Sequence, residues 1–254
     1  MTSKTHICIP DPHAVTGTNN RRAEWIGELI KDVKPDVVVN IGDMFDMPSL
    51  SSYDKGKGSF ANRRYKLDID AGLDFDDKLW HATKKAKKKK PRRVFLEGNH
   101  EHRLKRMLEY ETILEGTVGF KDFRLDENYT DVVEYKGASP GIISIDGINY
   151  AHFFISGVMG RAIGGENHAK SLLLKQHVSS TCGHSHLSDY AMATNGHGNK
   201  IMGLVAGVGH DHFESFAGAA NSLWWSGVII KRAVEDGVYE PQWVSLKTLE
   251  KEYG

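Results

Sequence analysis

The chain has 254 residues, of which 40% are hydrophobic and 26% are charged, an ordinary composition for a globular protein. Its formal net charge is zero, which excludes a global electrostatic field as the basis of nucleic-acid binding. No apolar run approaches the ~20 residues of a membrane span, and the N-terminus lacks the apolar region of a signal peptide. We therefore expect a cytoplasmic protein without a membrane partner. Cys8 and Cys182 lie in strand-like runs and are predicted to be buried free thiols.

The N-terminal segment predicts a β-α-β unit. Thr5–Pro10 has the pattern of a strand, and Asn20–Val33 has the apolar spacing of a helix, with Asn20 as its N-cap. Val37–Ile41 is a short apolar run, mostly β-branched, that ends at Gly42, and it predicts a second buried strand. We expect these two strands to be parallel and joined by a right-handed crossover.

Residues 47–90 predict a loop followed by a long helix. Met47–Phe60 is rich in Ser, Gly and Pro, and it is interpreted either as a functional loop or as a solvated connector. Ala61–Lys90 is predicted to be one helix with carboxylates near its start and lysines near its end. That charge order complements the helix dipole and is typical of a solvated face; contact with a phosphate backbone is the alternative.

The rest of the chain predicts further strands, two hairpins and two helices. The strands and hairpins are Val94–Glu97, the hairpin Ile142–Phe154 around Asp146-Gly147, Val178–Cys182, Ala191–Asn195, Ile201–Val205, and the hairpin Val228–Val234 with Val238–Val244. The helices are about Glu101–Leu114 and Ala162–Gln176. We find no internal repeat and no linker, and we predict one domain over residues 1–254 with an inserted loop and long helix at about 47–90. Early β-α-β units followed by hairpins predict an α/β fold with mixed sheets and helices on the outer faces.

Side chains of the metal-ligand type follow several predicted strands, and thirteen histidines is a high count. The candidates are Asp11, His13, Asp43, Asn99, His152, His184 and His186. Carboxylate, amide and imidazole donors without thiolate suit Mn²⁺, with Fe, Zn²⁺, Ni²⁺ or Mg²⁺ as alternatives. Asp43 leaves its strand at Gly42, at the carboxyl edge where α/β sheets bind ligands. Seven ligands with one bridging carboxylate match two half-open sites, and two such cations roughly 3.5–4 Å apart clamp a phosphoryl group.

The motifs occur in a specific order between Asp11 and His186: Asp-x-His, Gly-Asp-x-x-Asp, Gly-Asn-His-Glu, a single His, and Gly-His-x-His. This order resembles the calcineurin-like metallophosphoesterase superfamily, and the loop from Met47 to Gly56 is similar to that of stand-alone members encoded by bacteriophages. The resemblance implies a four-layer α/β/β/α sandwich with two mixed sheets and a dimetal site at the strand ends. If the chain is phage-encoded, its location is the cytoplasm of a bacterial host.

The resemblance also implies roles for individual residues. Three residues join Asp43 around one metal: Asp11, His13 and His186. Three others join Asp43 around the second metal: Asn99, His152 and His184. His100 would contact the substrate phosphate and act as general acid, and Asp46 would orient it. In the implied mechanism, a metal-bridging hydroxide attacks phosphorus in line and His100 protonates the departing alkoxide.

One departure from the family concerns the phosphate-binding arginine. Protein phosphatases carry Arg-Gly where this chain has Met47 and Pro48, and Met cannot replace a forked guanidinium. Arg63 and Arg64 lie just past the loop and are predicted to supply a substrate contact; exposed helix charges are the alternative.

A long loop and a basic tract beside the site favour an extended polyanion or a nucleotide as substrate. We therefore expect a phosphodiesterase, either a nuclease or a nucleotide phosphodiesterase. A phosphomonoesterase, including a protein phosphatase, is the alternative, and a non-catalytic binding scaffold is a third hypothesis that the intact ligands disfavour. Aromatic residues between Asp211 and Trp225, among them Phe216, are interpreted as stacking platforms or as packing under a loop. His210 and His212 resemble metal ligands, but seven candidates already fill the places, so we expect accessory or structural roles for them. The oligomeric state is left open.

Overall fold

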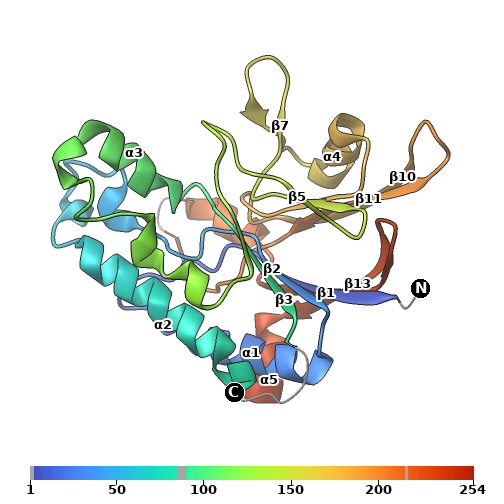
Figure 1. Ribbon diagram of the computed structural model, residues 1–254, viewed down its shortest axis with the longest axis horizontal. Coiled ribbons are helices and arrows are strands. Elements are labelled where there is room, and N and C mark those ends of the chain that lie inside the picture. Colours follow the sequence, from blue (N-terminus) through green and yellow to red (C-terminus); the bar gives the residue numbers. More distant parts are fainter. Residues whose placement is uncertain (1–2, 85–89, 215–216) are drawn as a thin grey trace.

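The computed structural model describes residues 3–84, 90–214 and 217–254 (Figure 1). Its largest sheet has six strands in the order β13-β12-β1-β2-β3-β4. Their bounds are β1 Lys4–Ile9, β2 Val37–Asn40, β3 Arg92–Leu96, β4 Asp131–Val133, β12 Gly227–Glu235 and β13 Val238–Ser245. Strands β1 to β4 are parallel, whereas β12 and β13 are antiparallel to their neighbours.

A second sheet has five strands in the order β10-β11-β9-β6-β5. Their bounds are β5 Ile143–Ile145, β6 Ile148–Tyr150, β9 Ser180–Cys182, β10 Ser188–Thr194 and β11 Lys200–Ala206. The inner strands β11, β9 and β6 are parallel, and the two edge strands are antiparallel. A small hairpin pairs β7 Ile155–Ser156 with β8 Arg161–Ala162. The predicted α/β class with mixed sheets is confirmed.

Five α-helices accompany the sheets in the described residues: α1 Arg21–Val33, α2 Tyr65–Lys84, α3 His102–Tyr110, α4 His168–Gln176 and α5 Leu246–Tyr253. Short 3-10 helices occur at Pro48–Leu50, Gly58–Phe60, Thr112–Leu114, Phe120–Phe123, Leu125–Glu127 and Gly218–Leu223. Figure 1 shows α1, α2 and α5 on the outer side of the six-stranded sheet and α4 beside the five-stranded sheet.

Alternating side chains along the strands fill different cores. In β1, Ile7 and Ile9 pack with the helices on the outer face, whereas Cys8 points to a cluster shared with Tyr150 of the five-stranded sheet. This follows from the two-residue period of a strand. The two sheets therefore bury their inner faces against each other, and their strand ends meet at a common edge. Cys8 and Cys182 are buried free thiols, as predicted.

Two predicted helices begin later than expected. The segment before α4 is not helical from Ala162, because Arg161–Ala162 pairs as β8 and Gly165 adopts a positive φ of 100°. Helix α2 starts at Tyr65 instead of Ala61, and Asn62 before it has a positive φ of 68°. The predicted continuation to Lys90 passes through residues 85–89, which lie outside the described residues together with most of the basic tract.

Other boundaries also differ from the predictions. Asn20 does not cap α1 with its side chain, which donates to Ala71 O and Asp74 Oδ2, while Asn19 Oδ1 accepts from the Arg21 amide. Helix α3 ends at Tyr110, and Thr112–Leu114 forms a separate 3-10 turn. The loop from Met47 contains two 3-10 turns, and His152 follows β6 instead of lying in it. Strand β4 and helix α5 were not predicted.

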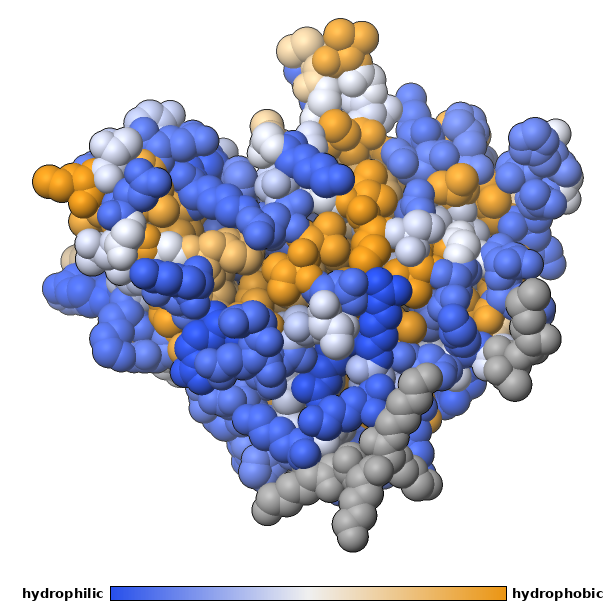
Figure 2. Space-filling view, viewed as in Figure 1, coloured by the Kyte–Doolittle hydropathy of each residue, from blue (hydrophilic) through white to orange (hydrophobic). Residues whose placement is uncertain are grey.

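The surface shows where apolar groups remain exposed. Figure 2 shows apolar side chains running from the β7–β8 hairpin toward the middle of the face, and the turn of this hairpin exposes Val158 and Met159. None of the helices in the described part of the chain combines the length and apolar character needed to cross a membrane.

Candidate metal centre

Three turns at the carboxyl ends of β1, β2 and β3 carry the first group of predicted site residues. Asp11 and His13 follow β1, Asp43 follows β2, and Asn99 and His100 follow β3. The φ angles of Asp11, His13 and Asp43 are 36°, 42° and 52°, a left-handed conformation that is costly for residues with a Cβ. Parallel strands end at the same edge, so these turns lie together.

The five-stranded sheet supplies the other candidates from its own strand ends. His152 follows β6, and His184 and His186 follow β9. His184 and His186 also have positive φ angles, of 66° and 60°. The fold thus brings together all seven candidates: Asp11, His13, Asp43, Asn99, His152, His184 and His186. Five are buried, and Asn99 and His184 are partly exposed.

Asp43 lies between two groups of imidazoles. Its Oδ2 is 3.3 Å from His152 Nε2 and 3.8 Å from His13 Nε2. Its Oδ1 accepts a hydrogen bond of 2.8 Å from the His100 amide. Burial favours the neutral form, but the facing His100 and His152 outweigh it and hold the pKa of Asp43 well below its usual value. The carboxylate is therefore placed and charged as a group shared by two cations would be.

One half of the centre consists of Asp43, His152 and His184, whose ligand atoms lie within 4.8 Å of one another. Asn99 Oδ1 is 2.9 Å from His152 Nε2. His152 Nδ1 is 2.9 Å from the carbonyl of Ile41 and donates to it, which turns Nε2 toward the site. This half offers carboxylate, amide and imidazole donors, and these residues could hold a divalent cation.

The other half brings His13 and His186 together with Asp11. His13 Nε2 is only 3.2 Å from His186 Nε2, and Asp11 Oδ2 is 3.4 Å from the same His186 atom. Asp11 Oδ1 is buried without a hydrogen-bond partner among the described residues, while Oδ2 accepts from the His184 amide at 2.6 Å. Lone pairs that face one another, with one carboxylate oxygen unpaired, fit a cation better than a closed hydrogen-bond network.

Two glycines make room for the carboxylates. A Cβ on Gly183 would lie 2.1 Å from Asp11 Oδ1, and a Cβ on Gly98 would lie 2.1 Å from Asp43 Oδ1. Neither contact is possible for real atoms. Steric exclusion of a Cβ therefore explains why the Gly-His-x-His and Gly-Asn-His-Glu motifs have glycine at these two positions.

Glu101 links the turns after β2 and β3 by hydrogen bonds, a role that the sequence analysis did not assign. It is fully buried, and its carboxylate accepts from the amides of Asp43 (3.0 Å), Phe45 (2.8 Å) and Gly98 (2.9 Å). Burial, together with the charge of Asp43, raises the pKa of Glu101. The only signal in the sequence was its position three residues after Gly98, inside the motif.

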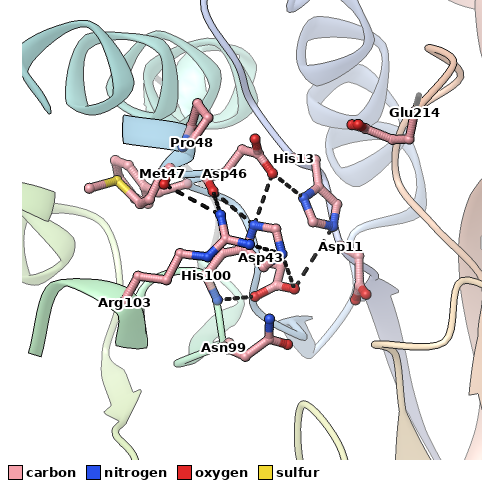
Figure 3. Close-up of polar contacts among 12 residues, drawn as sticks. Asp11, His13, Asp43, Asp46, Met47, Pro48, Asn99, His100, Arg103 and Glu214 are labelled. Carbon is pink, nitrogen blue, oxygen red and sulfur yellow. Dashed lines mark hydrogen bonds and ion pairs between the residues drawn. The ribbon is translucent and has the colours of Figure 1, made fainter. Parts of the chain in front are cut away.

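His100 and Asp46 are in direct contact, as Figure 3 shows. His100 Nδ1 lies 2.9 Å from Asp46 Oδ1 and 2.8 Å from its carbonyl oxygen, and His100 Nε2 lies 3.8 Å from Asp43 Oδ2. Asp46 Oδ1 also accepts from His13 Nδ1 at 2.8 Å. Burial opposes the charge on His100, but Asp43 and Asp46 outweigh burial and raise its pKa.

Arg103 on α3 was not predicted, yet it contacts His100. Its Nη2 lies 3.1 Å from His100 Nε2, and its Nη1 donates to the Asp46 carbonyl over 2.8 Å (Figure 3). Arg103 is one helical turn beyond His100, and that spacing is the signal that could have identified it. It provides a forked cation next to the site, where Met47 and Pro48 provide none.

Arg63 and Arg64 lie farther from the ligands. Arg63 Nη1 donates to Asp54 Oδ2 at 2.8 Å and to Pro48 O at 3.0 Å, and Arg64 Nη1 donates to the carbonyl of Arg63. Both line a cavity of about 430 Å³ that Asp46 also lines. They are thus beside the centre, with Arg63 already paired.

The segment after β11 packs against the centre. The Trp224 ring is 4.3 Å from that of His186, and Trp225 packs against the core between the sheets. Phe213 is exposed, and Phe216 lies outside the described residues. His210 is buried, and its ring centroid is 5.3 Å from that of His13. The sequence analysis assigned it an accessory or structural role because seven other residues already filled the ligand places.

No protein-family model matches the chain, and no curated protein matches it.

Proposed function

We propose that the chain is a dimetal-dependent phosphodiesterase of the calcineurin-like metallophosphoesterase superfamily, acting on nucleic acids or nucleotides. The observation that carries the proposal is the convergence of seven dispersed residues into one cluster, with the Asp43 carboxylate between its two halves. The arrangement of helices outside two facing mixed sheets supports the four-layer α/β/β/α sandwich expected for that superfamily.

The donors fit two divalent cations. Asp11, His13, Asp43 and His186 would hold one ion, and Asp43, Asn99, His152 and His184 would hold the other. When bound, such a pair supplies an activated water and neutralises charge on the phosphoryl oxygens. Oxygen and imidazole donors without thiolate suit Mn²⁺ first, with Fe, Zn²⁺, Ni²⁺ or Mg²⁺ as alternatives.

His100 would act as the general acid. Asp46 holds its Nδ1, so Nε2 faces the site, and the raised pKa of His100 keeps a proton available near neutral pH. Arg103 Nη2 lies 3.1 Å from that Nε2, a hydrogen bond that only the neutral imidazole can accept. We expect its guanidinium to turn to a substrate phosphate, because a forked donor matches phosphate geometry and would free Nε2 for the proton.

The surroundings favour a diester over a monoester. A cavity of about 470 Å³ reaches Asn99 and His184 and is also lined by Arg103, Tyr53 and Phe153. Arginine and aromatic side chains suit a nucleotide, because they bind phosphate and stack on bases. The cavity of about 430 Å³ beside Asp46 offers a second space for substrate groups. Two cavities flanking one centre suit a phosphate esterified on both sides.

Hydrolysis of paired substrates tests the proposal. Bis-p-nitrophenyl phosphate and p-nitrophenyl phosphate are compared with Mn²⁺ and after chelation. We expect diester cleavage to dominate and to be lost with chelator, and then single-stranded and duplex DNA become the next substrates. Dominant monoester cleavage would instead indicate a phosphomonoesterase. If the metal-loaded protein cleaves neither substrate, the chain is a highly selective enzyme or a binding scaffold.

A further inference from the structure

His210 is a buried histidine without a hydrogen-bonding role. It lies just after β11, is 1% exposed, and neither ring nitrogen has a hydrogen-bond partner among the described residues. A buried neutral imidazole whose donor and acceptor are both unpaired is destabilising, because neither group recovers the hydrogen bonds that it would make with water. An arrangement of this cost points to a partner that the protein atoms do not provide.

The ring geometry identifies the place of that partner. The ring centroids of His13 and His186 are 5.0 Å apart, and His210 is 5.3 Å from the first and 5.8 Å from the second. The three rings meet at steep angles of 71° to 90°, and one nitrogen from each lies within 4.8 Å of the others. Imidazoles that share a metal at a bond length near 2.1 Å have centroids about 5 Å apart.

The backbone around His210 is fixed to the turn that carries Asp11 and His13. The amide of Gly209 donates to the carbonyl of Asp11, and the buried Arg22 donates to the carbonyls of Gly209 and Pro12. A Cβ on Gly209 would lie 2.4 Å from the carbonyl of Pro10, so only glycine permits this approach. The position of the His210 ring is therefore set by the same turn as His13.

His212 and Glu214 pack against the opposite side of the His210 ring. His212 stacks on His210 with centroids 3.9 Å apart and planes at 23°, and His212 Nε2 donates to Glu214 Oε1 at 2.8 Å. Figure 3 shows Glu214 on the His13 side of the centre, away from Asn99. Stacked rings do not converge on one point, so His212 acts on the orientation of His210 instead of sharing a metal with it.

We propose that His210 is a further ligand of the cation held by His13 and His186. The inference rests on the proposed function, because it concerns one of the two proposed ions. It gives that ion three imidazole donors beside the carboxylates of Asp11 and Asp43. Imidazole donors favour Fe²⁺, Co²⁺, Ni²⁺ or Zn²⁺ over Mg²⁺, so a third histidine would make this site prefer those transition metals.

Calorimetric titration of the metal-free protein with Co²⁺ tests the inference. The wild type should bind two equivalents, and His210→Gln should weaken one of them by about tenfold or more while the other is unchanged. The visible Co²⁺ absorption should change in the same variant. The matched control is His197→Gln, which alters an exposed histidine in the turn between β10 and β11 and should change neither signal.

Equal affinity of His210→Gln and wild type for both equivalents would overturn the inference and leave the proposed function standing. A wild type that binds no Co²⁺ would overturn both. Loss of a third equivalent in His210→Gln would mean a separate site and would also contradict a shared ion. If the variant does not fold, the wild type is loaded with ¹¹³Cd and its ¹⁵N-labelled histidines are observed by NMR. Cadmium coupling is then expected for five rings, those of His13, His152, His184, His186 and His210; coupling for the first four alone would overturn the inference.

Discussion

The two ends of β1 carry buried histidines in opposite circumstances. Near its start, His6 faces the space between the sheets, with Nδ1 2.8 Å from the Tyr150 hydroxyl and Nε2 3.0 Å from Asp146 Oδ2. Beyond its end, His13 is equally buried, but its Nε2 faces another imidazole nitrogen, that of His186. Burial is therefore the same at both ends, and the hydrogen-bond partners differ.

This difference separates a structural polar cluster from a candidate metal site. Each ring nitrogen of His6 has a conventional partner, so a neutral imidazole is satisfied there, and burial lowers its pKa to about 4. At the other end, nitrogen and oxygen atoms with lone pairs face one another, and there are too few N–H groups to pair them. Asp11 Oδ1 and both His210 nitrogens have no hydrogen-bond partner among the described residues. Accounting for each buried polar atom is thus more informative than counting histidines.

Asp43→Asn should have the largest effect. An amide cannot serve as the shared anionic ligand, and a loss of several kcal/mol of transition-state stabilisation corresponds to at least about a 10⁴-fold drop in diester hydrolysis. The measurement is the rate of diester hydrolysis in the presence of Mn²⁺, made on variant protein that is shown to be folded. The matched control at the other end of β1 is Asp146→Asn, which should leave the rate within about threefold; equal losses in both variants would remove the contrast between the ends.

His100→Ala should come next, with a drop of about 10³-fold in diester hydrolysis and unchanged metal binding. The reason is loss of a positioned proton donor, which typically contributes 10²–10⁴-fold. Rates are compared with His81→Ala, which removes an exposed histidine on α2. Hydrolysis by His100→Ala as fast as by the control would exclude His100 as the acid.

The pH dependence of stability should report on His6. Its folded pKa, about 4, is below the ordinary value of 6.5, so the unfolded chain takes up the proton first. Stability from this group is present above pH 6.5 and is lost as pH falls toward 4, by about 3 kcal/mol in total. Urea unfolding in chelator at pH 7 and pH 4.5 should therefore show a smaller acid loss in His6→Gln than in wild type. Identical losses would contradict this assignment.

Lys231→Met should have the smallest effect, within about 1 kcal/mol of wild type at pH 7 and tending toward greater stability. Lys231 is fully buried opposite His6, burial lowers its pKa to about 8, and its ammonium contacts the hydroxyls of Tyr150 and Thr181. Replacing a buried charge by an apolar chain of similar length removes its desolvation cost. Unfolding in urea measures the change, and destabilisation beyond about 3 kcal/mol would show that the cluster depends on this charge.

Local patterns predicted much of the fold. Apolar runs predicted the long strands, and the pairs Asp146-Gly147 and Asp236-Gly237 predicted the two hairpin turns. All four turn residues have positive φ angles in the structure. Strand β4 was missed because it offers only two adjacent apolar residues, Val132 and Val133, between Asp131 and Glu134, and so shows neither an apolar run nor alternation. The predicted start of α4 was wrong because Arg161–Ala162 pairs with β7 as a strand. Local spacing of apolar residues does not encode such a pairing.

The candidate site was predictable wherever its residues follow strands in sequence. The seven candidate ligands lie in such turns and come together. Glu101 and Arg103 act through contacts across the fold, with the Asp43 amide and the Asp46 carbonyl, and spacing alone did not reveal them. His210 reaches the centre because Gly209 packs on the turn after β1, a contact between residues about 200 positions apart in the chain. The metals, the substrate and the single-domain organisation stay predictions.

Counting bound metal tests the central claim most directly. Wild type, Asp43→Asn and Asp146→Asn are equilibrated with Mn²⁺, dialysed and analysed for metal per chain. We predict two ions in the wild type and in Asp146→Asn, and fewer in Asp43→Asn, because only the far end of β1 builds a cation site. The claim that Asp43 is a shared ligand of two cations would be contradicted by a wild type that binds no ion, or by an Asp43→Asn variant that retains two ions.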